Sequence, residues 1–285
     1  AQAVLAQETL RGPGAGPLPG PPPAMGCCSG APAGPPGELG VELGPGVVRV
    51  RGDDQVLRAK AIDCATASFV GTDHSDPEGT LDWALGPQLA GKWDDPRRRI
   101  MVEWIMRMFD VNVHDQGKGF VLAAPLEAGE LGAVCVVIPK PHGPSSKLAD
   151  GFAKLGVLRK NGLPPLKKMG DARKGMEKRL DSFSVIYEVQ RRHAAGPHIY
   201  VQVMAVHPDA QGRGLCGKLM RQVNVYADKL GLPLYLETSG EKNASIYKRF
   251  GYEVVEQYTI ECKNDPDSSA PHSDEFGMLR PAQNS

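Results

Sequence analysis

The sequence predicts an α/β (α+β) domain, and three observations support this. Short apolar runs of strand length alternate with longer stretches in which apolar residues recur at helical spacing, in the order β-α-α-β-β-α-β-α-β-α-β-β. A glycine-rich turn opens one of the helices at Gly212. The first 46 residues have a separate, low-complexity composition. One domain is therefore expected at residues 47–282 of the 285, preceded by a tail.

The tail, residues 1–46, is rich in Gly, Pro and Ala. Such a segment buries too little apolar surface to offset its ordering entropy, so we expect it to be disordered. Gly26, Cys27 and Cys28 follow a methionine, as in doubly acylated proteins. Because Gly30 stands where the myristoylation pattern has Ser or Thr, an internal methionine in a loose tail is the simpler interpretation.

Composition narrows the functional classes. The 33 Lys and Arg balance 33 Asp and Glu, so no overall field favours nucleic acid or a membrane surface. No run of ~18 apolar residues predicts a membrane span. The six cysteines show no C-x-x-C or Cys/His cluster. This argues against a metal site or a disulfide framework and favours a reducing, cytoplasmic location.

The domain opens with a strand at residues 47–50 and a helix at 56–70. Asp94-Asp95-Pro96 predicts the start of a second long helix, because Asp is a favoured N-cap and Pro fits the first turn. Its apolar stripe consists of Ile100, Trp104, Ile105 and Met108.

Two apolar runs at residues 120–123 and 133–138 predict a β-hairpin. Residues 139–178 interrupt the pattern as a basic insertion with short apolar runs. It is expected to be a solvated helical segment, or alternatively a surface that meets a phosphate or an acidic substrate. The periodicity from Met176 to Val189 then predicts another helix.

The most informative stretch runs from His198 to Glu237. It predicts an apolar strand, a glycine turn, a helix that ends at Gly231, and a second strand. A glycine turn at a helix start leaves backbone N–H groups pointing outward beside the positive end of the helix dipole. The stretch therefore predicts a phosphate-binding site.

Three patterns compete for these glycines. Gly212-x-Gly214-x-x-Gly217 satisfies the dinucleotide fingerprint. Glu237 lies about 20 residues downstream, at the position of the acid that binds the ribose. A P-loop is excluded because Leu219 replaces the magnesium-binding Ser or Thr. The third pattern is Gln211-x-x-Gly214-x-(Gly/Ala), which follows a strand that ends in Val-x-Pro.

The remainder of the chain favours the third pattern. A doubly wound dinucleotide domain needs further βα units after the glycine turn. Only 48 of the 285 residues follow Glu237, and their strands are in hairpin-like order. Asn243 and Tyr247 follow the Leu-Glu-Thr-Ser strand at helical spacing, and Gly251 ends their helix. A strand at residues 252–261, a polar loop at 263–275 and a last strand at 276–280 are expected after it. Together these motifs resemble the GCN5-related N-acetyltransferase (GNAT) superfamily, most closely the branch that contains puromycin N-acetyltransferase. The strong resemblance covers residues 197–261.

The resemblance implies the GNAT acyl-CoA N-acyltransferase fold, whose central mixed, mostly antiparallel sheet is flanked by helices. It implies acetyl-CoA as co-substrate and no metal. It also implies a coenzyme-binding set composed of Met204, Ala205, Val206, Gln211, Gly212, Arg213, Gly214, Leu215, Cys216, Gly217 and Asn243.

Within that set, Cys216 departs from the family's small second residue of the loop. We interpret it as a tolerated small residue that points away from the phosphates. The alternative is a functional thiol, because a helix N-terminus lowers the pKa of cysteine.

An alkyl amine of pKa ~10.4 is almost wholly protonated at neutral pH, so the reaction benefits from a base. Glu237 is the expected base, because burial at a strand end beside the cofactor helix raises its pKa toward the working pH. Tyr247 matches the family tyrosine near the coenzyme A sulfur and is the expected acid. The alternatives are local pairing for Glu237, a core position for Tyr247 and helix capping for Asn243.

The predicted function is transfer of an acetyl group from acetyl-CoA to a primary amine, on a small molecule or a peptide, by direct attack in a ternary complex. The resemblance places the oxyanion donors on the backbone of Met204 to Val206. A non-catalytic coenzyme A-binding sensor or scaffold remains the alternative. Retention of Glu237 and Tyr247 favours the enzyme.

Overall fold

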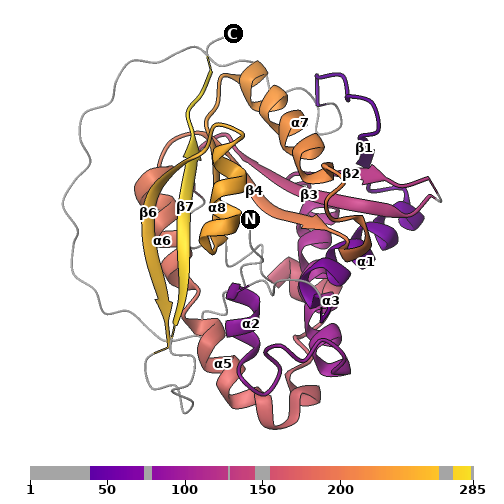
Figure 1. Cartoon of the computed structure of the whole chain (residues 1–285), viewed down its shortest axis with the longest axis vertical. Coiled ribbons are helices and arrows are strands. Elements are labelled where there is room, and N and C mark those ends of the chain that lie inside the picture. Colours follow the sequence, from indigo (N-terminus) through magenta and orange to yellow (C-terminus); the bar gives the residue numbers. More distant parts are fainter. Residues whose placement is uncertain (1–38, 74–78, 128, 145–154, 263–271, 284–285) are drawn as a thin grey trace.

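The computed structural model describes residues 39–73, 79–127, 129–144, 155–262 and 272–283 (Figure 1). Its strands form one sheet in the order β1-β2-β3-β4-β5-β7-β6. All neighbouring strands are antiparallel except β4 and β5, which are parallel. The predicted mixed, mostly antiparallel sheet is confirmed. The strands are β1 (Val48–Val50), β2 (Phe120–Pro125), β3 (Leu131–Lys140), β4 (His198–Val206), β5 (Leu234–Ser239), β6 (Glu253–Glu261) and β7 (His272–Arg280).

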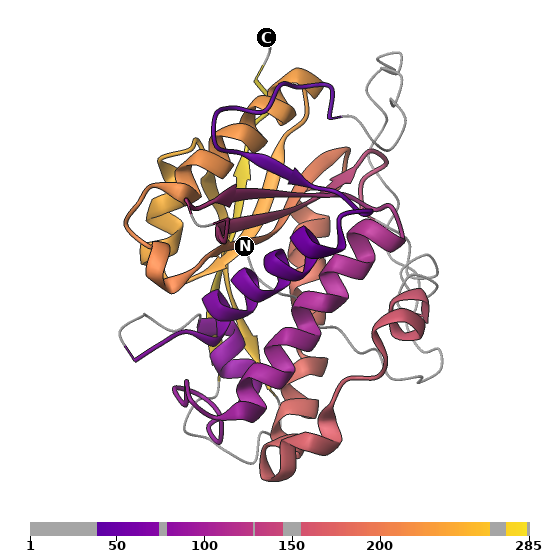
Figure 2. The same ribbon diagram turned by 90° about the vertical axis from the view of Figure 1, so that its right-hand side faces the viewer.

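Helices cover both faces of the sheet. Because side chains alternate along a strand, Tyr235 packs on the α1, α2, α3, α5 and α6 side, whereas Leu234 and Leu236 pack on the α7 and α8 side. Figure 2 shows α1 and α3 lying side by side on the first face. The helices are α1 (Gln55–Val70), α2 (Gly79–Leu85), α3 (Pro96–Asp110), α5 (Arg173–Asp181), α6 (Ser184–His193), α7 (Leu215–Leu230) and α8 (Glu241–Lys248), with the short turns η1 (Val111–Asp115), η2 (Leu166–Ala172) and η3 (Pro208–Ala210).

Two elements differ from the sequence expectation. The helix expected from Met176 to Val189 is divided into α5 and α6, because Ser182 and Phe183 donate to carbonyls three residues earlier and close a tight turn. The last strand begins at His272 and not near Phe276, since its antiparallel pairing with β6 extends that far. In each case pairing or packing across the fold overrides local periodicity.

Residues 39–46 run along α7, although they belong to the stretch expected to be disordered (Figure 2). The Gln222 side chain of α7 accepts from the Gly44 N–H at 2.8 Å and donates to the Glu42 carbonyl at 3.0 Å. Leu39 and Leu43 pack on the apolar core beside α7. We call residues 39–46 the strap. The lipidation motif at residues 26–28 lies outside the described residues.

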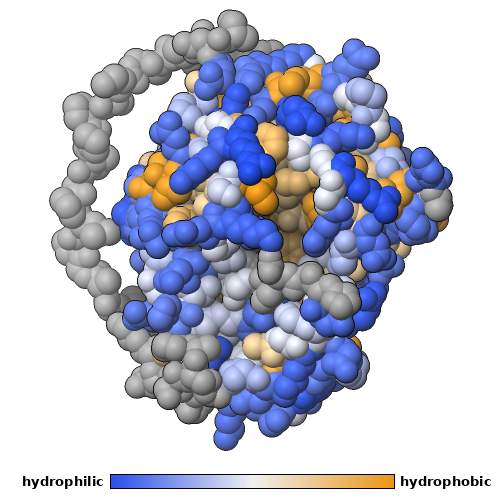
Figure 3. Space-filling view, viewed as in Figure 1, coloured by the Kyte–Doolittle hydropathy of each residue, from blue (hydrophilic) through white to orange (hydrophobic). Residues whose placement is uncertain are grey.

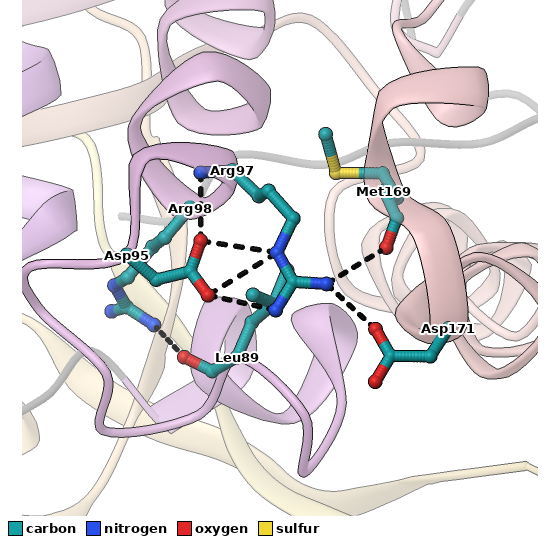
Figure 4. A network of polar contacts seen from close by, with 6 residues as sticks. All are labelled: Leu89, Asp95, Arg97, Arg98, Met169 and Asp171. Carbon is teal, nitrogen blue, oxygen red and sulfur yellow. Dashed lines mark hydrogen bonds and ion pairs between the residues drawn. The ribbon is translucent and has the colours of Figure 1, made fainter.

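The described part of the basic insertion is packed into the domain. Met169 and Met176 are completely buried beside α2 and α3. Arg97, at the start of α3, pairs with Asp95 at 2.8 Å and with Asp171 at 2.6 Å, and also donates to the Met169 carbonyl (Figure 4). These bonds join the insertion to the N-terminus of α3.

Two buried arginines fix α2 and the loop that follows it. Arg98 donates to the Leu89 carbonyl (Figure 4). It also donates to the Val70 carbonyl and pairs with Asp82. Its guanidinium also lies 5.0 Å from the centre of the Trp93 ring, and Arg179 lies 5.4 Å from that of Trp83. For Arg98, the Asp82 carboxylate, the backbone carbonyls and the Trp93 ring stabilise a charge that burial would otherwise leave unpaired.

Among the described residues, no helix is both long and apolar enough to cross a bilayer. In the same part of the chain, no group of three or more His, Cys, Asp or Glu side chains is placed to hold a metal ion.

Candidate active site

The site is built around an opening between β4 and β5. These parallel strands pair only at Ile199 with Leu234 and at Tyr200 with Tyr235. A bulge follows at Gln202, where β4 gains one residue relative to β3. Beyond it the two strands part, and Figure 3 shows apolar residues in a recess in the middle of the face that carries α8. The opening exposes one backbone edge of β4.

The β4 amides at this edge point into the opening. His207 donates its N–H to the Gly132 carbonyl on the β3 side at 2.9 Å. Because successive N–H groups alternate in direction, those of Val206 and Met204 face the opening. The Val206 N–H donates to the Ser68 hydroxyl of α1 at 3.2 Å. Ser68 carries no motif and was missed by sequence analysis.

The glycine turn forms the N-terminus of α7 as predicted. Gly212 and Gly214 have φ values of 75° and 72°, in the region that favours glycine, and open space lies where their side chains would be. The helix closes with the Lys218 N–H donating to the Gly214 carbonyl. The preceding N–H groups at 215–217 therefore lack helical acceptors and form a cradle for an anion. Gln211 and Arg213 are exposed beside it.

Cys216 lies in the first turn of α7, half-buried. Burial raises the pKa of its thiol above the ordinary value. The side chain is therefore a neutral thiol at neutral pH. This supports the interpretation of Cys216 as a tolerated small residue.

Glu237 lies on β5 at the opening and is completely buried. Burial is the main cause that raises the pKa of its carboxyl group to about 7. The Tyr200 and Tyr235 hydroxyls lie near enough to lower this pKa in part, although neither satisfies hydrogen-bond geometry. Within the described residues neither carboxylate oxygen has a hydrogen-bond partner. Local pairing therefore does not account for Glu237.

Tyr247 and Asn243 lie on α8, across the sheet from Glu237. Tyr247 is buried in the α7 side core, with its ring edge-to-face on Tyr252 at 6.1 Å. Asn243 donates to the Ser239 carbonyl at 3.1 Å. Glu237 and Tyr247 therefore lie on opposite faces of the sheet.

A second buried carboxylate lies near Glu237 and was not predicted. Glu275 of β7 is completely buried and accepts from the hydroxyls of Thr80 and Ser273, the latter at 2.8 Å. In register it lies opposite Ser239, one pleat from Glu237 on the same face. The sequence predicts a polar loop at residues 263–275, so it does not identify this carboxylate.

The sheet order, the single parallel pair that parts midway, and the glycine turn opening α7 define the GNAT acyl-CoA N-acyltransferase fold. Residues 182–254 match the family model described as "Acetyltransferase (GNAT) domain". This match supports placing the protein in the GNAT superfamily and supports an acyl-CoA N-acyltransferase enzyme.

Several solved structures with similar folds are described as acetyltransferases. One is described as a histone acetyltransferase HPA2 and related acetyltransferase from Corynebacterium glutamicum, with 18% identity, a TM-score of 0.49 and coverage of 84% of this chain and 97% of the other. Another is arylalkylamine N-acetyltransferase 2 from Aedes aegypti, with 12% identity, a TM-score of 0.48 and coverage of 83% and 98%. These scores describe a likeness and carry no conclusion about substrate.

Proposed function

We propose that the protein transfers an acetyl group from acetyl-CoA to a primary amine, by direct attack of the amine on the thioester in a ternary complex. The observation that carries this proposal is Glu237, a buried carboxylate without a hydrogen-bond partner among the described residues, at the parting of β4 and β5. A carboxyl pKa of about 7 makes it an effective base at neutral pH.

The residues present fit coenzyme A. The outward N–H groups at the start of α7 and the open space over Gly212 and Gly214 suit a pyrophosphate. The amides of Met204 and Val206 face the opening, where they are positioned to stabilise the oxyanion that forms on the acyl carbonyl. Ser68 then exchanges its bond to Val206 for another partner when the opening fills.

The two faces of the sheet divide the chemistry. The amine arrives on the side of Glu237, which takes a proton from the ammonium or from the attacking nitrogen. Tyr247 lies on the side of α7 and gives a proton to the departing thiolate. The assignment to the puromycin N-acetyltransferase branch and the identity of the amine remain predictions.

The test is thiol release from acetyl-CoA with a broad panel of primary amines and peptides. The Glu237→Gln variant should lower kcat about 10²-fold or more and Tyr247→Phe by a smaller factor, with little change in acetyl-CoA affinity. Glu253→Gln is the matched control, because Glu253 is exposed on β6.

Acetyl-CoA binding without turnover on any amine would favour the alternative, a coenzyme A-binding sensor. Binding of NAD in place of acetyl-CoA would overturn the family assignment as well.

A further inference from the structure

A completely buried base needs an exit for the proton that it collects. Glu237 has no exposed surface, so solvent does not reach its carboxyl group directly. Its carboxyl group must lose one proton in each cycle before the next amine reacts. The side chains on the same sheet face define where that proton can travel.

One row of this face leads from Glu237 to the surface. Gly277 of β7 is the register partner of Glu237 on one side and of Glu256 on the other. Two strand spacings place the Cα atoms of the two glutamates about 10 Å apart. Gly277 contributes no side chain between them, so the middle of the row is free for a group from elsewhere.

The Tyr235 hydroxyl occupies this gap. A Cβ atom at Gly277 would lie 2.9 Å from the Tyr235 hydroxyl oxygen and 3.1 Å from a Val189 methyl group. The hydroxyl has no hydrogen-bond partner among the described residues. Burial, followed by the Glu237 carboxylate, raises the pKa of Tyr235, so the phenol stays neutral and can accept one proton while it donates another.

The outer end of the row is a carboxylate–histidine pair. A Glu256 oxygen lies 2.6 Å from the His193 Nε2 atom, and the other accepts from Arg192 at 2.5 Å. The Glu256 and His193 side chains are 26% and 29% exposed, so they reach solvent. A proton that arrives at Glu256 can therefore leave the molecule.

We propose that Tyr235 and Glu256 relay the proton from Glu237 to His193 and the solvent. For this step the Tyr235 hydroxyl bonds to both carboxyl groups, directly or through one water. The Glu237 carboxyl group gives its proton to the Tyr235 oxygen while the Tyr235 hydroxyl proton passes to the Glu256 carboxylate. Glu256 passes it to His193 or water. Tyr235 is unchanged, and the net result is one proton moved outward. This relay rests on the proposed role of Glu237 as base.

Other titratable groups surround the row. Tyr200 of β4 lies near Glu237, and Tyr187 of α6 lies near Tyr200. The Glu188 carboxylate raises the pKa of Arg192. Tyr258 of β6 lies in the next row, opposite Glu275. Its hydroxyl is as buried and as unpartnered as that of Tyr235, but it does not stand over Gly277. Tyr258 is therefore the matched comparison.

The experiment measures kcat, KM and the solvent deuterium isotope effect for Tyr235→Phe and Tyr258→Phe. Tyr235→Phe should lower kcat about tenfold, leave both KM values unchanged and raise the isotope effect, because proton release becomes limiting. Added small buffer acids and bases should restore part of the rate. Tyr258→Phe should keep kcat within about twofold.

A double-mutant cycle identifies the path. Glu256→Gln should lower kcat like Tyr235→Phe, and the double variant should be no slower than the slower single variant. Additive losses, equal loss in Tyr258→Phe, or an unchanged isotope effect in Tyr235→Phe would each overturn the relay. If wild type turns over and Glu237→Gln does not, the proposed function stands even when the relay fails. Thermal unfolding of each variant confirms that it is folded.

Discussion

Burial in the folded protein disfavours the ionised form of Glu237. Its pKa of about 7 exceeds the ordinary glutamate value of 4.5, so between these pH values the folded protein binds more protons than the unfolded chain. Stability contributed by this site is therefore present below about pH 4.5 and falls as pH rises toward about pH 7.

The Glu237→Gln variant should remove that dependence. Relative to wild type, it should gain stability as pH rises from about 4.5 to about 7, and the gain should level off above this range. Urea unfolding of both proteins across this range measures the difference. A difference that does not change with pH would show that the Glu237 carboxyl titrates normally in the folded protein. The kcat/KM of wild type should rise over the same range, as the carboxylate forms.

Residues that belong to motifs could be identified from the sequence. Residues that strand pairing brings next to Glu237 could not. Glu237, Tyr247 and the loop at 211–217 follow one another within a continuous stretch, so their spacing alone brings them near one site. Gly277 and Glu256 meet Glu237 only because β7 inserts between β5 and β6. An unexplained glycine within a strand was the one available signal.

At the scale of elements, α7 depends on the left-handed conformation of Gly214 at its N-terminus. An alanine there would keep the open space but would cost about 1–2 kcal/mol of backbone strain. The strain would be relieved by moving the amides that form the anion cradle, so cofactor affinity should fall together with stability.

Gly214→Ala should therefore lower Tm and raise the KM for acetyl-CoA. The matched control is Gly175→Ala, an equally uncrowded glycine inside α5, where φ is not positive. There the same substitution should stabilise by about 0.5–1 kcal/mol, since alanine is the better helix former. Calorimetry and initial-rate kinetics on both variants test the opposite signs. Equal changes in Tm would contradict the role assigned to the Gly214 backbone.

The order of elements was also largely predictable, because amphipathic periodicity and turn residues mark each one. The break between α5 and α6 was not, since it lacks Gly or Pro and follows from packing against α2 and the sheet. Nor did composition reveal that the basic insertion buries Met169 and Met176. The many charged residues of the insertion indicate a solvated segment, whereas its few apolar residues determine where it packs.

For the whole molecule, the strap extends the folded unit beyond the boundary predicted at residue 47. It buries Leu39 and Leu43 in part and forms two hydrogen bonds with Gln222. Each of these hydrogen bonds contributes about 1 kcal/mol, and the burial of the two leucines adds to it.

A chain that begins at residue 47 should therefore unfold a few degrees below one that begins at residue 39. Thermal melts of the two chains test this, with Gln222→Ala in the longer chain as a partial version of the loss. Removing the strap from the Gln222→Ala chain should have a smaller effect than removing it from wild type. Equal melting temperatures for the two chain lengths would show that the strap adds no stability.

Trp83 and Trp93 stack against Arg179 and Arg98, and these positions determine which part of the protein tryptophan fluorescence reports on. The chain has three tryptophans, and the third, Trp104 of α3, donates to the Gly162 carbonyl. Trp83 lies on α2 and Trp104 on α3, while Trp93, between these helices, lines a cavity together with His207 and Asp209. Indole fluorescence is therefore a built-in probe of α2, α3 and the cavity that Trp93 lines.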